Sequence, residues 1–311
     1  MRRKVFFSQK NLFNLSQKIR DTVLSVLINN RRCVQLNLSE TDLKANHLWE
    51  DKVYNSLKRF FVSSKIEASI HIEGYPSILS SNTGFHIFID PVDGSLNCDL
   101  AVGDPAVVIA YAYGKMPSFK DIFCGYVYCL RSKDTYFSKK GCVYYRKAES
   151  KKPFRVKCDS SVKKLRDAIL YYNDGYGQEF AEASFKKAGA LPLFVKHRNA
   201  FDNAAAEICQ LARGAAHLRV EARSYQKGRQ KRGSDHANIL TAFSIGKPAG
   251  LIVTDLEGKP LDDIIIKLDE SQDFICVASK ELLDETLNVL RHNQELLRRI
   301  LDRECRSVEE S

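Results

Sequence analysis

The stretch that decides the fold is Asp90-Pro91-Val92-Asp93-Gly94-Ser95-Leu96-Asn97, which directly follows an apolar run at residues 85–89. The apolar run predicts a buried strand that ends at Asp90-Pro91, because proline cannot donate a hydrogen bond to a neighbouring strand. Asp90 and Asp93 flank the proline-fixed turn, so both carboxylates can point at one spot beyond the strand. Oxygen ligands of this kind suit magnesium.

The residues that follow Asp93 suit an anion. Gly94 lets the backbone approach a ligand closely, and a helix that begins at Ser95 would offer free N–H groups to a phosphate. An ordinary Asp-Pro turn with serine as a helix cap explains the same residues, so this stretch alone leaves both interpretations open.

Around this stretch, the first half of the sequence predicts helices followed by a sheet. Apolar residues recur at helical spacing at residues 12–27 and again at 46–61. Glycine and charged turns separate the next strand candidates, which suggests an antiparallel sheet built from hairpins. These strands are expected at residues 106–113, 122–130, 135–137 and 143–145.

The second half alternates strands and helices, which predicts an α/β layer. Strands are expected at residues 168–172, 193–196, 216–220, 249–254 and 274–278, and helices at 178–188, 203–212, 235–243 and 280–303. A basic linker at residues 147–157 predicts two subdomains. The first is an N-terminal α+β subdomain (1–157) that carries the metal-binding turn. The second is a C-terminal α/β subdomain (158–311) that completes the site.

Composition narrows the class of protein. The chain has 311 residues, 44% of them hydrophobic and 28% charged, and its net charge of +10 favours an anionic partner. The cations are dispersed and match no nucleic-acid motif, so we expect a small phosphorylated metabolite and no nucleic acid. No apolar run is long enough for a bilayer, so we expect no membrane association. Nine cysteines form no CxxC pair, which predicts free thiols and a cytoplasmic location.

Residues 90–95 resemble the signature Asp-Pro-Ile/Leu/Val-Asp-Gly-Thr/Ser of the inositol monophosphatase superfamily. Three further segments follow the family's order. Ile70-His71-Ile72-Glu73-Gly74 falls where the family has Gly-Glu-Glu. Residues 198–214 are similar to its Arg-Ser-x-Gly-Ser-Ala-Ala helix. Ser234-Asp235-His236-Ala237-Asn238, with residues 249–261, resembles its Trp-Asp-x-Ala-Ala … Ala-Gly-Gly … Gly-Lys-Pro pattern.

The resemblance implies a layered α-β-α-β-α sandwich of the sugar-phosphatase type and a magnesium-dependent phosphomonoesterase with two or three Mg²⁺ ions. The carboxylates of Glu73, Asp90, Asp93 and Asp235, with the Val92 carbonyl, would bind these ions. Ser95 would orient the attacking water and, with Gly94 and Ala204, bind phosphate; Glu50, or else Asp51, would be a supporting acid. Simpler explanations stay open: Glu73 as a surface glutamate, Asp235 as a helix cap, and Glu50 on a solvated helix face.

A basic run at residues 223–232 precedes Asp235 and is similar to the Asp-Val-Arg loop of archaeal-type members. Its Arg223 is a candidate ligand for a second substrate phosphate, and a solvated basic loop is the alternative. The resemblance departs at Gly74, Ser234 and Asn238, which replace a family Glu, Trp and Ala, and near Asp202, where a Gly is expected.

The predicted substrate is inositol-1-phosphate or fructose-1,6-bisphosphate. The alternatives are a 3′-phosphoadenosine-5′-phosphate phosphatase of the same superfamily and, less favoured, a non-catalytic basic protein that binds nucleic acid. The resemblance further implies a homodimer or homotetramer.

Overall fold

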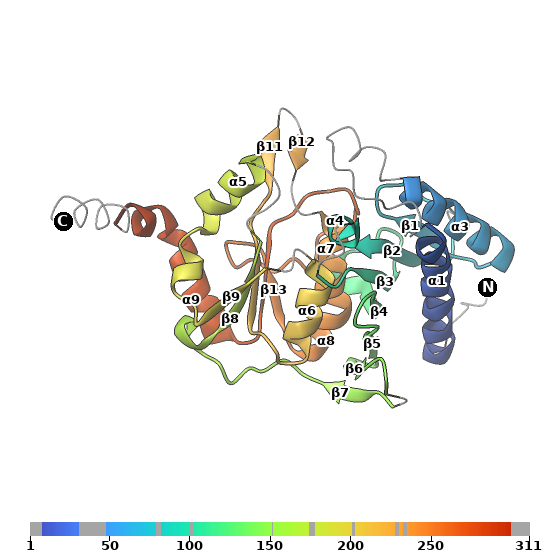
Figure 1. Cartoon of the computed structure of the whole chain (residues 1–311), viewed down its shortest axis with the longest axis horizontal. Helices are drawn as coiled ribbons and strands as arrows, with labels where there is room; N and C mark the ends of the chain where they lie inside the picture. Colours follow the sequence, from blue (N-terminus) through green and yellow to red (C-terminus); the bar gives the residue numbers. More distant parts are fainter. Residues whose placement is uncertain are drawn as a thin grey trace.

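Five alternating layers of helix and sheet make up the molecule (Figure 1). The structure is a computed structural model that describes residues 8–30, 48–78, 82–99, 103–150, 152–173, 178–200, 203–227, 230–232 and 235–299. Helices α1 and α3 form one outer layer and α5 and α9 the other, with α6, α7 and α8 between the two sheets. Apolar cores fill the spaces between successive layers. The predicted α-β-α-β-α sandwich is therefore confirmed.

The first sheet has seven strands that follow one another in chain order. Its first pair is parallel and every later pair is antiparallel. The strands are β1 (Ser69–Ile72), β2 (Phe85–Asp93), β3 (Ala106–Tyr113), β4 (Ile122–Cys129), β5 (Thr135–Lys139), β6 (Cys142–Arg146) and β7 (Phe154–Val156).

The outer helices α1 (Gln9–Asn30) and α3 (Leu48–Ser64) cover one face of this sheet. Their apolar stripes enter the core as the periodicity predicts, and Leu12, Ile19, Val23, Val53 and Leu57 are fully buried there. The short helix α4 (Ser95–Asp99) follows β2 directly.

The second sheet has the order β13-β14-β10-β8-β9. Its strands are β8 (Ile169–Tyr172), β9 (His197–Asn199), β10 (Leu218–Glu221), β13 (Ile252–Thr254) and β14 (Phe274–Val277). Helices α5 (Gln178–Ala188) and α9 (Lys280–Arg291) lie on its outer face. A separate hairpin joins β11 (Tyr225–Lys227) to β12 (Gln230–Arg232).

The central layer connects the two sheets. It contains α6 (Ala204–Ala212) and a continuous helical stretch of α7 (His236–Thr241), the π-helix η5 (Ala242–Gly246) and α8 (Lys247–Ala249). Both α6 and α7 contact β3, and α6 also contacts β10. Because α6 and α7 begin near the end of β2, this layer brings distant parts of the sequence to the metal-binding turn.

Four expectations of secondary structure need correction. Strand β2 does not stop at Asp90-Pro91: it continues to Asp93, which pairs with Ala106 after a register shift that bypasses the proline. No strand forms at residues 193–196, where the turn at Leu191–Leu193 occupies the start and β9 follows. The expected linker at residues 147–157 contains the strand β7 (Phe154–Val156). The strand β1 (Ser69–Ile72) was not predicted at all.

The last helix is shorter than the predicted 280–303. Helix α9 ends at Arg291 with His292 as its cap. The buried Asn293 turns its side chain inward, accepting a hydrogen bond from the Ala190 backbone N–H at 2.7 Å. A new helical segment then covers residues 293–299, and residues 300–303 lie outside the described part.

In the described segments, no helix has both the length and the apolar character that crossing a bilayer requires. The seven cysteines in the described residues are free thiols, four of them buried. The division of the chain at residues 157/158 into subdomains stays a prediction.

Candidate active site

Parallel pairing of β1 and β2 places Glu73 beside the Asp90 turn. The two strands end at the same edge of the sheet, and the Glu73 backbone N–H donates to the Ile89 carbonyl at 3.0 Å. The chain then reverses through Gly74, whose φ of +73° a residue with a Cβ would adopt at a cost. The family's second Glu is therefore replaced here by a residue that suits a tight turn.

Backbone N–H groups fix the two aspartates of the turn. The Val92 N–H donates to Asp90 Oδ1 at 3.0 Å, and the Ala205 N–H, in the first turn of α6, donates to Asp93 Oδ2 at 2.6 Å. Both aspartates are buried. The start of α6 thus stabilises one carboxylate, as expected where a helix N-terminus meets a negative charge.

Asn203 connects the start of α6 to the same turn. It caps the helix, and its Nδ2 donates to the backbone carbonyls of Asp93 at 3.1 Å and Asp104 at 2.6 Å. Gly94 has a φ of +80°, and a Cβ there would lie 3.1 Å from Asn203 Nδ2. A larger residue at position 94 would therefore disturb this connection.

Asp235 reaches the site from the central layer. It is the N-cap residue of α7, a helix that contacts β2. Its carboxylate accepts a hydrogen bond from the side-chain amide of Asn238, with Oδ1 and Nδ2 2.9 Å apart. The carboxylate of this capping residue is thus held by a side chain one turn into α7.

We call Glu73, Asp90, Asp93 and Asp235 together the acidic cluster. Burial, then the charges of Asp90 and Asp235, raises the pKa of Glu73 well above its usual value. Burial and Asp93 do the same to the pKa of Asp90. Burial raises the pKa of Asp93 to about 7, although the hydrogen bond from the Ala205 N–H acts in the opposite direction. Burial also raises the pKa of Asp235 to about 6.

The acids of the cluster act on one another. Contacts of Glu73 with Asp90 and Asp235 contribute to the pKa shifts of all three carboxyl groups, so their charges are not independent. Within the described ranges, no three acidic, imidazole or thiol side chains are placed so that they could hold a metal ion as they stand. The cluster offers hard oxygen donors with excess negative charge, which is the chemistry that a magnesium ion needs.

A second set of charged side chains lies on α6, on β10 and just after β10, close enough to affect the acidic cluster. We call Glu207, Arg219, Glu221 and Arg223 the ion chain. Arg219 Nε donates to Glu207 at 2.7 Å and its Nη2 to Glu221 at 2.9 Å. Arg223 makes two bonds to Glu221, at 2.5 and 3.0 Å. Glu207, Arg219 and Glu221 are all at most 1% exposed.

The ion chain acts on the acidic cluster through its charges. Burial favours protonation of Glu221, but Arg223 and Arg219 hold the pKa of its carboxyl below the usual value. The charge of Arg219 lowers the pKa of Asp93, and that of Arg223 lowers the pKa of Asp235. The two arginines therefore favour the ionised, ligand-ready forms of these two acids.

The four predicted acidic ligands lie near enough for their charges to act on one another, and their role as metal ligands stays a prediction. Arg223 lies close enough to act on them, although Glu221 occupies its guanidinium. Glu50 lies in the first turn of α3, where its charge acts on the hydroxyl of Tyr75. Ser95 begins α4 and Ala204 begins α6. The roles predicted for Glu50, Val92, Gly94, Ser95, Ala204 and Arg223 stay predictions.

Sequence reasoning missed several residues that shape the site. Asn203 appeared only as part of an expected helix and Asn238 only as a departure from the family pattern. Arg219 lay inside an expected strand and Glu221 directly after it, with no role assigned to either. The alternation Leu218-Arg219-Val220-Glu221 carried a signal, because it puts two opposite charges on one face of a buried strand. Asp202 and Ser234 lie outside the described residues, as do the side chains of the basic run from residue 226 onward.

Five alternating layers with buried carboxylates at their centre define a layered α/β protein of the sugar-phosphatase type. Residues 14–295 match the inositol monophosphatase family, so the chain belongs to this family of phosphatases.

Individual relatives agree with this assignment. The fructose-1,6-bisphosphatase/inositol-1-monophosphatase of Archaeoglobus fulgidus is 27% identical over 201 residues, which cover 65% of this chain and 67% of the relative. The extragenic suppressor protein suhB from Bartonella henselae has a TM-score of 0.64 at 17% identity, covering 90% of this chain and 98% of its own. A calcium-bound IMPase family protein from Staphylococcus aureus has a TM-score of 0.61 at 17% identity, with 90% and 93% coverage. The two solved structures share the fold.

Proposed function

We propose that this protein is a Mg²⁺-dependent phosphomonoesterase that hydrolyses a small sugar or inositol phosphate, such as inositol-1-phosphate or fructose-1,6-bisphosphate. The observation that carries the proposal is that Glu73, the β2 residues Asp90 and Asp93, and Asp235, the N-cap residue of α7, come near enough for their charges to act on one another. The bisphosphatase/monophosphatase activities named for the archaeal relative support the substrate class. The calcium-bound family member supports a divalent cation.

The acidic cluster would hold the metal, with the Val92 carbonyl as an additional ligand. When bound, magnesium supplies a Lewis acid that polarises the ester phosphate and lowers the pKa of a bound water. Asp90 is oriented by the Val92 N–H, Asp93 by the Ala205 N–H and Asp235 by Asn238. These contacts limit side-chain motion, so the carboxylates need little reorganisation to bind.

The remaining proposed roles concern the substrate. The Ser95 hydroxyl would orient the attacking water, and the backbone at Gly94, Ser95 and Ala204 would bind the phosphate oxygens. Glu50 would support the acid–base steps from α3. Arg223 would favour a substrate with a second phosphate, since its guanidinium lies next to the cluster and keeps 15% of its side chain exposed.

A phosphate-release screen tests the proposal. Inositol-1-phosphate, fructose-1,6-bisphosphate and 3′-phosphoadenosine-5′-phosphate are compared with and without Mg²⁺. We expect release of phosphate from one of the first two esters only with the metal, and an Asp93→Asn variant at least about 100-fold slower. Asp284→Asn, a matched change of an exposed aspartate on α9, should retain full activity.

Two results would contradict the proposal. One is unchanged turnover in Asp93→Asn, which would remove Asp93 from the metal site. The other is the absence of Mg²⁺-dependent release from either of the first two esters. A preference for 3′-phosphoadenosine-5′-phosphate would assign the chain to the nucleotide branch instead.

A further inference from the structure

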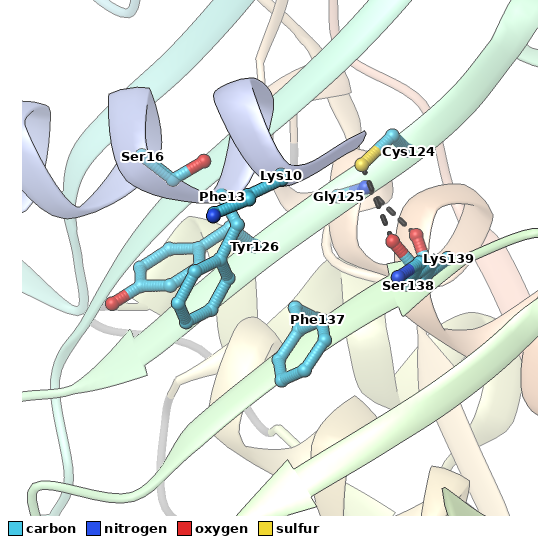
Figure 2. Close-up of a pocket in the computed structure, with 9 residues that line it drawn as sticks. All are labelled: Lys10, Phe13, Ser16, Cys124, Gly125, Tyr126, Phe137, Ser138 and Lys139. Atoms are coloured by element: carbon cyan, nitrogen blue, oxygen red, sulfur yellow. Dashed lines mark hydrogen bonds between the residues drawn. The ribbon is translucent and has the colours of Figure 1, made fainter. Parts of the chain in front are cut away.

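A pocket of about 250 Å³ lies on the face of the first sheet that α1 covers (Figure 2). It opens between α1 and the strands β4 and β5. Helices α6 and α7, which contribute to the acidic cluster, contact this sheet from its other face. The pocket is therefore separate from the candidate active site.

Buried residues of β4 and β5 form the floor of the pocket. Ser138 Oγ accepts a hydrogen bond from the Gly125 N–H at 2.8 Å, and the Cys124 thiol donates to the Ser138 carbonyl at 3.2 Å (Figure 2). Ser138 is only 3% exposed, and its side chain faces the central layer, as does that of its β6 partner Val143, because side chains alternate along a strand and Phe137 faces α1.

Gly125 makes this floor rigid. A Cβ at this position would lie 2.3 Å from the Cβ of Ser244 in the π-helix η5. The glycine therefore lets the central layer support the strand directly beneath the pocket. The floor is part of the packed interior.

Aromatic rings form the walls. Phe13 of α1 and Phe137 of β5 have centroids 4.8 Å apart at an interplanar angle of 56°, and both rings are partly exposed (Figure 2). Phe13 also meets the buried Tyr126 edge-on, with centroids 5.8 Å apart. Rings in this arrangement offer faces and edges to a further planar group.

The rim of the pocket is positively charged. Lys10 and Lys139 line it and are exposed, and neither forms an ion pair with an acidic side chain in the described part of the chain. The Arg146 guanidinium adds a third cation, 6.0 Å from the centroid of the Phe13 ring. No acidic residue lines the pocket.

We infer that this pocket binds a small aromatic carboxylate. Its ring would lie against Phe13 and Phe137, and its carboxylate would accept hydrogen bonds from Lys10 and Lys139. The volume suits a single ring, because pockets for drug-sized ligands begin at about 300 Å³. Apolar walls with a few convergent polar groups are typical of small-molecule sites.

Fluorine NMR with 4-fluorobenzoate tests this inference on the full chain, freed of divalent ions so that the acidic cluster holds no metal that could attract the probe. We expect a dissociation constant of about 1 mM, as for a ligand of this size. The neutral 4-fluorobenzyl alcohol has the same ring and should bind at least about threefold more weakly, because it cannot use the lysines. Equal binding of the two probes would overturn the inference.

Variants locate the site. The double variant Lys10→Gln/Lys139→Gln should weaken 4-fluorobenzoate binding by about three- to tenfold. The matched control Lys115→Gln/Lys152→Gln removes two exposed lysines elsewhere and should leave binding unchanged. Phe137→Ala should weaken both probes, because it removes a wall. Binding that survives the lysine and Phe137 changes, or no binding at about 10 mM probe, refutes the site.

Discussion

The acidic cluster and the ion chain are neighbouring sets of buried and half-buried charged side chains, and they differ in how those charges are balanced. The ion chain pairs two glutamates with two arginines through hydrogen bonds of 2.5–3.0 Å. The acidic cluster contains four acids and no basic side chain. Glu221 consequently has a lowered pKa, whereas all four acids of the cluster have raised ones.

This difference separates structure from function. A buried ion pair is stable when its partner is present and costly when the partner is removed. A buried group of like charges is costly in itself and becomes favourable only when protons or a cation neutralise it. The ion chain therefore supports the fold, and the acidic cluster has the properties of a site for a cation.

The largest expected effect comes from breaking the ion chain. A Glu221→Gln change would leave Arg223 and part of Arg219 without a counter-charge in the interior. We expect a loss of about 3 kcal/mol in the free energy of unfolding, measured by urea denaturation.

A surface pair provides the control for this experiment. Glu257 and Lys259 lie 3.6 Å apart, and both side chains are more than 70% exposed. Glu257→Gln should change the free energy of unfolding by less than about 0.5 kcal/mol. If Glu221→Gln costs no more than this control, the ion chain does not compensate buried charge and the contrast with the acidic cluster fails.

The same contrast explains what the sequence could predict. Asp90 and Asp93 directly follow an apolar run, so a local pattern predicted both the buried strand and the position of the two carboxylates at its end. Family resemblance added Glu73 and Asp235, which no local pattern connects to that turn. Periodicity and strand–helix alternation predicted the helices and strands, whereas the five-layer arrangement followed from the resemblance.

What the sequence could not supply were interactions between distant elements. Asn203 joins α6 to the Asp93 turn across 110 positions of sequence, and Ala205 offers only a backbone N–H, which has no residue signature. The strand expected at residues 193–196 failed because a short apolar segment fits a turn equally well. Helix α9 ended early because Asn293 satisfies buried backbone groups on α5, which periodicity cannot reveal.

A second prediction concerns pH. The pKa of Asp93 is raised to about 7 by burial, above the value of about 3.9 expected in the unfolded chain. This group therefore contributes stability below about pH 4 that is lost as the pH rises through 7. We expect the metal-free protein to lose about 2 kcal/mol more between pH 5 and pH 8 than the Asp93→Asn variant does, measured by urea unfolding at each pH.

The comparison with the variant is needed because other groups titrate in the same range. Burial lowers the pKa of His71 to about 4, and a histidine of this kind stabilises the fold as the pH rises. Saturating Mg²⁺ should remove the destabilisation at pH 8 in the wild type, since the ion binds the ionised carboxylates. Parallel pH profiles for wild type and variant would contradict the charge imbalance of the acidic cluster.

The smallest expected effect separates charge from orientation within the acidic cluster. Asn238 stands where the family has Ala. It carries no charge, yet its side-chain Nδ2 donates a hydrogen bond to Asp235 Oδ1 at 2.9 Å. Asn238→Ala should weaken Mg²⁺ binding by about tenfold, because groups that orient a metal ligand typically contribute this much. Calorimetric titration with Mg²⁺ measures the change directly, and Asn288→Ala, on an exposed position of α9, is the matched control.

Weaker binding with an unchanged pH profile would mean that a neutral hydrogen bond positions Asp235, while the excess charge alone creates the demand for a cation. Unchanged Mg²⁺ affinity would mean that the amide contributes nothing to the site, leaving charge as the one property that distinguishes the cluster from the ion chain.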